Sequence, residues 1–261
     1  MQNRLMLRPE QPLLIVLEGI DLSGRTTQVE LLRDWLLAQR YAVTTTAWRT
    51  SPLISDVLAR ARQGPPLRPL TYSLLYWADH MDRTQQVIRP ALQRGEIVLA
   101  DRYMYTAFAR DAARGLDPIW VRGLYRFSAR PDIVFYLHIS PEEAVKRRLA
   151  LQHFDSTRKE QKQGKSGKLK KSGKLRNLEK PEKSGGKKVK KQGKQQVALP
   201  LPALTGQAPE SYREFENRMY SEYQHMRKEF DFCVIEGSQS IDAVQATLRR
   251  TIMQSLLRIH V

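Results

Sequence analysis

A short segment bounded by glycines, GIDLSGRTT at residues 19–27, carries the first residues whose types and spacing could do chemistry. Gly19 and Gly24 lie five positions apart, and Arg25 and Thr26 follow the second glycine directly. Glycines at this spacing let backbone N–H groups converge on the oxygens of a phosphate, and the threonine hydroxyl can hold Mg²⁺. The segment therefore predicts a phosphate-binding loop.

Arg25 stands where this loop motif carries lysine. Lysine is a compact point charge, whereas the guanidinium is planar and bulkier, so the exchange is not conservative at a close-fitting phosphate site. The positive charge is nevertheless kept, and arginine binds phosphate well. We therefore expect phosphoryl transfer to survive at a reduced rate.

A second candidate pair, Asp101 and Arg102, follows the apolar run at residues 97–100. An Asp-Arg dipeptide is often only a surface ion pair. Beside a phosphate-binding loop, however, the carboxylate can hold a cation opposite Thr26 while the guanidinium grips a phosphate with two hydrogen bonds. We therefore interpret the pair as functional.

Five short apolar runs predict the strands that must position these residues: Leu13 to Leu17, Ala42 to Trp48, Ile97 to Ala100, Ile133 to His138 and Cys233 to Glu236. The segments between them predict helices, including one from Thr71 to Arg94 with a kink or break near Arg89, before Pro90. Strands alternating with helices imply an α/β fold with a five-stranded parallel sheet flanked by helices on both faces. Ligands bind beyond the carboxyl ends of such strands, where the two motifs can meet.

The net charge of +17 comes mainly from one segment. Residues 158–194 hold 14 Lys and 2 Arg against 3 Glu, a net charge of +13. The wider stretch 155–208 is rich in Lys, Gly, Ser and Gln and lacks apolar periodicity, so it cannot bury enough surface to offset its ordering entropy. We predict a disordered insertion within one domain of residues 1–261, because the last strand follows it.

Two roles are open for this lysine-rich insertion. It can be a tolerated loop expansion, since each doubling of loop length costs only about 0.6 kcal/mol. It can also bind a polyanion such as nucleic acid or polyphosphate, without sequence preference because no aromatic residues are interleaved.

The sequence also indicates the cellular compartment in which the protein works. No run approaches the roughly 20 apolar residues of a membrane span, and the first fifteen residues lack the pattern of a signal peptide. Cys233 is the single cysteine, so no intrachain disulfide can form. We expect a cytoplasmic protein without a membrane partner.

Four segments, in their order and spacing, resemble thymidylate kinase and its bacterial thymidylate-kinase-like relatives: LIVLEGIDLSGRTTQ, LLYWADH, VLADRYMYTAFA and PDIVFYLHISPEEAVKRR. The resemblance covers most of the chain outside the insertion, which lies where that family has a mobile lid. It implies a P-loop kinase fold and a nucleoside-monophosphate kinase that uses ATP and Mg²⁺ to phosphorylate dTMP to dTDP. It also suggests a homodimer.

The resemblance assigns a role to each matching position. The loop that binds ATP would be formed by Gly19, Ile20, Asp21, Leu22, Ser23, Gly24, Arg25, Thr26 and Thr27. The metal would be held by Thr26 and Asp101. The acceptor nucleotide would be bound by Asp21, Arg49, Tyr76, His80, Arg102 and Thr106, with Tyr76 stacking on the base and Arg49 and Arg102 on the phosphate. Catalysis would fall to Asp21, Arg25, Arg102, Arg147 and Arg148.

Two positions depart from the family pattern. His80 stands where the family often has an arginine that hydrogen-bonds the pyrimidine, with Arg83 one turn further on, so the acceptor base stays open. Leu22 stands where one branch has a catalytic arginine. The other branch supplies that charge from the lid, where Arg147 and Arg148 are the candidates.

Two other functions therefore stay open beside the kinase. One is a degenerate kinase fold that holds nucleotide and uses its basic segment to bind nucleic acid or another polyanion. The other is a deoxynucleoside kinase, which shares the loop and the Asp-Arg pair and differs mainly in its acceptor.

Overall fold

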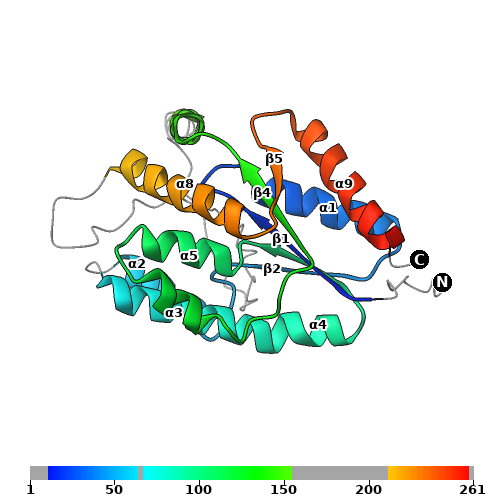
Figure 1. Ribbon diagram of the computed structural model, residues 1–261, viewed down its shortest axis with the longest axis horizontal. Helices are drawn as coiled ribbons and strands as arrows, with labels where there is room; N and C mark the ends of the chain where they lie inside the picture. Colours follow the sequence, from blue (N-terminus) through cyan, green and yellow to red (C-terminus); the bar gives the residue numbers. More distant parts are fainter. Residues whose placement is uncertain (1–10, 64–66, 155–210, 259–261) are drawn as a thin grey trace, which may run out of the picture. The chain divides into compact units, whose positions relative to one another are not determined.

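The computed structural model describes residues 11–63, 67–154 and 211–258 (Figure 1). The insertion predicted at 155–208 lies outside these described residues. The chain divides into two units, Met1–Lys146 with Leu201–Val261, and Arg147–Pro200. In the second unit the described residues, 147–154, are helical. Within the described parts of the chain, no helix is long and apolar enough to cross a membrane.

A five-stranded sheet forms the centre of the first unit, and all its strand pairs are parallel. The strand order is β2-β3-β1-β4-β5. The strands are β1 (Leu13–Glu18), β2 (Val43–Ala47), β3 (Ile97–Asp101), β4 (Ile133–His138) and β5 (Cys233–Glu236). The predicted fold is confirmed. Leu17 of β1 pairs with Asp101 of β3, so the two motif-bearing strands end side by side.

Helices connect the strands, as alternating β and α segments require. They are α1 (Arg25–Ala38), α2 (Ser55–Gln63), α3 (Pro69–Arg83), α4 (Arg89–Gln93), α5 (Met104–Ala112), α6 (Pro118–Leu124), α8 (Tyr212–Glu229) and α9 (Ile241–Arg258). The segment expected to be one kinked helix is divided into α3, a π-helical turn at Thr84–Ile88 and α4. Pro90 lies just after the π turn and cannot donate a backbone hydrogen bond to the preceding turn, which accounts for a break at this place.

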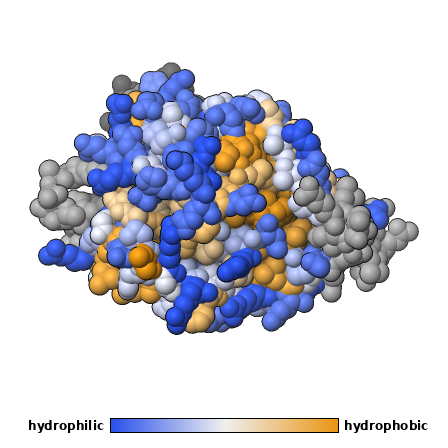
Figure 2. All heavy atoms as spheres, in the orientation of Figure 1, coloured by the Kyte–Doolittle hydropathy of each residue, from blue (hydrophilic) through white to orange (hydrophobic). Residues whose placement is uncertain are grey.

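Alternate residues of β1 pack on opposite faces of the sheet, as the period of two in a strand dictates. Leu14 and Val16 belong to a core cluster with α5 and α8, while Leu13, Ile15 and Leu17 belong to one with α1 and α9. Figure 1 shows these two helix pairs on either side of β1. On the face shown in Figure 2, apolar surface is divided into patches by hydrophilic side chains. Helices thus cover both faces and leave the strand ends to build a site.

Helix α8 begins with a reciprocal cap. Ser211 Oγ accepts a hydrogen bond from Glu214 N at 3.2 Å, and the Glu214 carboxylate accepts one from Ser211 N at 3.0 Å. This capping box satisfies two backbone donors of the first turn and fixes where the helix starts. It thereby fixes which α8 side chains face the sheet.

Candidate active site at the carboxyl ends of the strands

The segment between β1 and α1 has the backbone that a phosphate loop needs. Gly19 has a φ of 148°, and a Cβ there would lie 2.6 Å from the Leu137 carbonyl oxygen. Gly24 has a φ of 94° and precedes the first residue of α1. Glycine alone tolerates both positions, so the chain turns tightly and presents the N-terminal amides of α1 to the loop.

Arg25 folds back into this loop and is 7% exposed. Its Nη1 donates to the carbonyl oxygens of Gly19 and Ile20, and to Ser23 Oγ at 2.9 Å. Its Nε lies 3.2 Å from Asp101 Oδ1. The guanidinium is therefore held by the loop's own oxygens through Nη1 and by Asp101 through Nε, and a lysine ammonium, with one nitrogen, does not have this two-nitrogen geometry.

Thr26 and Asp101 meet at the ends of the loop and of β3. Thr26 Oγ1 donates to Asp101 Oδ2 at 2.5 Å. A hydroxyl and a carboxylate are hard oxygen ligands of the kind Mg²⁺ takes beside substrate phosphates, so this donor set fits the metal. Among the described residues no group of three or more His, Cys, Asp or Glu could hold a metal. Such a magnesium site needs only one or two protein oxygens, with phosphates and water completing it.

Arg102 brings three predicted acceptor residues together. Its backbone is in the left-handed region, with a φ of 71°. One guanidinium nitrogen, Nη2, pairs with the Asp21 carboxylate, and the other, Nη1, donates to Thr106 Oγ1 at 3.3 Å. Burial acts to lower the pKa of Arg102, but the nearby acidic groups, with Asp21 first among them, together outweigh burial and raise that pKa above its usual value. The guanidinium therefore stays charged where a phosphate could bind.

Glu18, which sequence reasoning missed, ties β1 to the segment after Asp101. Its fully buried carboxylate accepts hydrogen bonds from Tyr103 N at 2.8 Å, Thr106 Oγ1 at 2.5 Å and Tyr223 OH at 2.8 Å. Burial raises its pKa, and these hydrogen bonds oppose the rise. The available signal was a lone carboxylate at the end of an apolar strand, directly before Gly19.

Glu216 was also missed, because it lies on α8, 195 residues from the loop that it contacts. Its Oε2 accepts a hydrogen bond from Asp21 N at 3.1 Å. Burial, and next the nearby Asp21 carboxylate, raise the pKa of Glu216 to about 8. No local sequence signal pointed to this contact.

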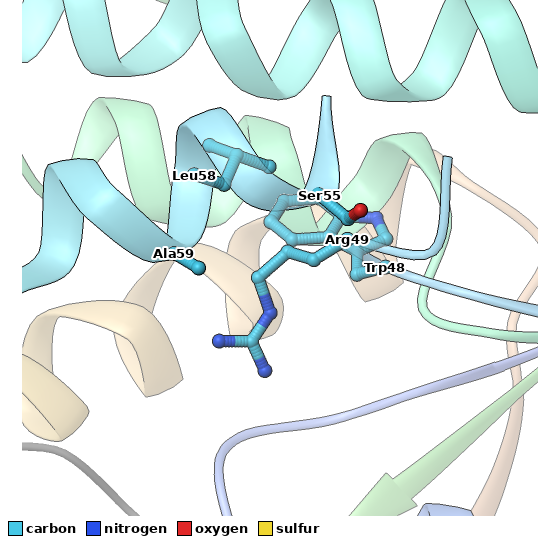
Figure 3. Close-up of a pocket in the computed structure, with 5 residues that line it drawn as sticks. All are labelled: Trp48, Arg49, Ser55, Leu58 and Ala59. Atoms are coloured by element: carbon cyan, nitrogen blue, oxygen red, sulfur yellow. The ribbon is translucent and has the colours of Figure 1, made fainter. Parts of the chain in front are cut away.

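Arg49 lies beside a pocket at the end of β2. Its backbone has a φ of 66°, and its N–H donates to Asp79 Oδ2 at 3.0 Å. The pocket has a volume of about 220 Å³ and is lined by Trp48, Arg49, Ser55, Leu58 and Ala59 (Figure 3). In Figure 3 the Arg49 guanidinium extends away from Leu58. The side chain therefore reaches out from a backbone that Asp79 holds in place.

Tyr76 and His80 lie on one helix but have different neighbours. The Tyr76 ring lies 4.9 Å from that of Trp48 and 4.7 Å from that of Tyr72, measured between centroids. The His80 ring instead lies 4.7 Å from that of Tyr103, and its Nε2 lies 2.7 Å from Ser128 Oγ. Burial, and next Arg83, lower the pKa of His80 well below its usual value. His80 is therefore a neutral side chain among rings that Tyr76 does not contact.

The other predicted loop and lid residues are placed as follows. The Ile20 side chain is fully buried in the core, and that of Thr27 is exposed. Leu22 adopts a φ of 63°, again in the left-handed region. Arg147 and Arg148 belong to the second unit, so their catalytic role remains a prediction.

Known proteins are similar to this chain over a region that includes the phosphate loop and Asp101. A family model described as thymidylate kinase matches residues 17–183. A protein from Saccharolobus solfataricus named probable thymidylate kinase 2 is 42% identical over 135 residues, which are 52% of this chain and 63% of that protein. A probable thymidylate kinase from Thermococcus kodakarensis is 35% identical over 142 residues, 51% of this chain and 69% of that protein. One from Halobacterium salinarum is 31% identical over 150 residues, 55% and 74% of the two chains. The match to the Saccharolobus protein thus spans less than two thirds of its length.

Proposed function

Because the chain belongs to the thymidylate kinase family, we propose that it transfers the γ-phosphoryl group of ATP to dTMP, giving dTDP. The observation that carries this proposal is the meeting of two motifs at one carboxylate. Asp101 accepts from Thr26 at 2.5 Å and lies 3.2 Å from Arg25, 75 and 76 residues away in sequence. A loop for donor phosphates and a carboxylate for their cation thus share one edge of the sheet.

The proposed mechanism rests on position and charge. The loop amides and Arg25 hold the donor phosphates, and Thr26 and Asp101 hold the Mg²⁺, which when bound neutralises charge on the phosphate oxygens. Arg102 and Arg49 hold the phosphate of the acceptor, and Asp21 orients the Arg102 guanidinium. No general base is needed, because the acceptor phosphate is already ionised. Arg147 and Arg148 are proposed to meet the charge that develops in the transition state.

The deciding experiment incubates the purified protein with Mg-ATP and a panel of nucleosides and nucleoside monophosphates. We expect ADP release that depends on dTMP, and dTDP as the product by chromatography. ADP release with nucleosides alone would identify a deoxynucleoside kinase instead. Absence of acceptor-dependent ADP across the whole panel would overturn the kinase, and a metal-site variant, Asp101→Asn, controls for contaminating activity.

We further propose that the segment 158–194 binds polyanions without sequence preference, supported by its net charge of +13. Deleting residues 160–195 should leave turnover with dTMP unchanged and abolish salt-sensitive binding to DNA or RNA. Equal binding by the intact and deleted chains would favour the tolerated loop expansion.

A homodimer and a cytoplasmic location complete the proposal. The dimer is supported by the family resemblance alone, and light scattering of the purified chain tests it through the molar mass. The location is supported by the single cysteine, Cys233, which suits a reducing compartment. Fractionation of cells that express the chain tests it.

A further inference from the structure

An arginine occupies the place where the Tyr76 ring would be expected to meet a base. The Arg110 guanidinium carbon lies 4.0 Å from the centroid of Tyr76, 4.6 Å from that of Trp48 and 5.2 Å from that of Tyr72. We call these four residues the arginine-aromatic cluster. Tyr76 itself is only 5% exposed, and its hydroxyl lies 3.0 Å from that of Tyr72. A ligand that approaches Tyr76 therefore meets Arg110.

Asp111 fixes the Arg110 guanidinium. Both Nε and Nη2 of Arg110 lie 2.7 Å from Asp111 Oδ1, and the other carboxylate oxygen accepts from Ser73 Oγ at 2.5 Å. Asp111 is fully buried and Arg110 is 5% exposed. The guanidinium is therefore a rigid feature of the site, since both its partner and that partner's orientation are set by buried contacts.

Nη1 and Nη2 of Arg110 are both buried and have no hydrogen-bond partner among the described residues; Nη2 at least lies at ion-pair distance from Asp111, whereas Nη1 has no such contact. A buried donor without an acceptor is destabilising, because it has lost its water without replacement. Two arginines also share one carboxylate. Arg114 Nη1 lies 3.8 Å from Asp111 Oδ1, which Arg110 contacts as well. Burial, and next Arg110, lower the pKa of Arg114 to about 10. The cluster is therefore prepared for an oxygen acceptor that the described residues do not supply.

Two contacts connect this cluster to the phosphate end of the acceptor site. Arg110 lies one turn beyond Thr106 on α5, about 6 Å along the helix axis, and Thr106 contacts Arg102. Trp48 Nε1 donates to the Tyr103 carbonyl oxygen at 3.2 Å, and Trp48 also lines the pocket beside Arg49. A nucleotide whose phosphate lies at Arg102 and Arg49 would thus place its base toward the arginine-aromatic cluster.

We propose that Arg110 reads the acceptor base, by donating a hydrogen bond from Nη1 to O4 of thymine. This inference rests on the proposed kinase function and deepens it. A guanidinium only donates hydrogen bonds, so it pairs with O4 of thymine, whereas cytosine carries at position 4 an amino group that is itself a donor. His80, at the position where the family often has its base-reading arginine, contacts Ser128 and Tyr103 instead. Arg110 therefore takes over base selection from a different helix.

The test compares kcat/KM for dTMP and dCMP in the intact protein and in Arg110→Met, which keeps an unbranched apolar stem over Tyr76. We expect the preference for dTMP over dCMP to fall about tenfold, through a higher KM for dTMP. The matched control is Arg126→Met, because Arg126 is exposed and its guanidinium lies 4.4 Å from the Phe127 ring, outside the cluster. This control should leave both values unchanged.

Sulfur-substituted analogues of dTMP supply a second measurement, which begins with the intact protein. In the intact protein, replacing O4 of dTMP by sulfur, a weaker acceptor, should lower kcat/KM about fivefold, whereas the same replacement at O2 should leave kcat/KM unchanged. The Arg110→Met variant should lose that sensitivity.

Three results would overturn the inference. They are an unchanged dTMP to dCMP ratio in Arg110→Met, equal rates with dTMP and its O4 thio analogue in the intact protein, or a variant with higher kcat/KM for every acceptor. The last would show that Arg110 obstructs the base. Failure of the kinase proposal is distinguishable, because then the intact protein phosphorylates no monophosphate at all.

Discussion

The donor and acceptor halves of the site are built in different ways. On the donor side, Arg25 contacts Gly19, Ile20 and Ser23, all within six residues of it, and only Asp101 comes from a distant strand. On the acceptor side, the contacts join α5, α3, the end of β2 and α8, and the Asp21 to Glu216 contact spans 195 residues. The donor half is thus formed mainly by one contiguous sequence motif, whereas the acceptor half is formed by residues that tertiary packing brings together.

This difference explains which positions of the site can exchange side chains most easily. A contiguous loop must keep its glycines, because Gly19 and Gly24 adopt backbones that other residues strain to reach. The acceptor half can exchange side chains between helices while keeping the strand ends in place. The proposed transfer of base reading from the position of His80 to Arg110 is of this kind. Substitutions should therefore affect the donor half through turnover and the acceptor half through KM and selectivity.

Asp101→Asn should have the largest effect and fall on turnover. The amide cannot balance the charge of Arg25 or bind a cation as a carboxylate does, so we expect kcat to fall on the order of 100-fold or more. The measurement is the initial rate of ADP release across a range of Mg²⁺ concentrations. Asp34→Asn, at an exposed pair with Arg33, is the matched control. A decrease of less than about threefold would show that the donor half does not depend on this carboxylate.

Arg25→Lys should raise kcat by up to about tenfold, because a compact ammonium leaves the loop carbonyl oxygens more readily than a guanidinium that bonds two of them. Single-turnover rates with saturating ATP measure the effect. Arg25→Met, which removes the charge, should lower the same rate. An unchanged or lower rate in Arg25→Lys would contradict the idea that arginine slows the transfer.

Trp48→Phe should act on the acceptor half alone. It removes the hydrogen bond from Nε1 to the Tyr103 carbonyl oxygen. It also weakens the packing of this ring, which lines the pocket, against Arg110. We expect KM for dTMP to rise about threefold to tenfold while KM for ATP stays unchanged. Trp120→Phe, at a partly exposed position on α6, is the control. An equal rise in both KM values would show that the two halves are not separable.

The sequence predicted the donor half and the sheet well because both depend on local signals. A buried apolar run, a glycine and a threonine at fixed spacing define β1, the loop and the start of α1 without knowledge of the rest of the chain. Asp101 could be placed opposite Thr26 because parallel strands end at a common edge. Glu216 and Arg110 could not be predicted in this way. Their roles depend on which helices pack together, and an arginine or glutamate on an amphipathic helix is usually solvated.

Glu216→Gln should have the smallest effect, seen in stability rather than rate. Burial, and next Asp21, hold the pKa of Glu216 at about 8 in the folded protein, above its ordinary value of 4.5. The folded state therefore keeps a proton that the unfolded state releases between these two values. Any stability that Glu216 contributes is complete below about pH 4.5 and is lost as the pH rises through about 8.

Glutamine cannot ionise, so the variant should match the intact protein at low pH and become more stable than it above pH 8, by at most about 5 kcal/mol, which is the full conversion of this pKa difference. Thermal unfolding followed across this pH range makes the comparison. Glu222→Gln, one to two turns further along α8, controls for the exchange itself. A stability difference that does not vary with pH would mean that Glu216 is already ionised beside Asp21. The carboxylate from α8 would then act on the loop only as a fixed charge.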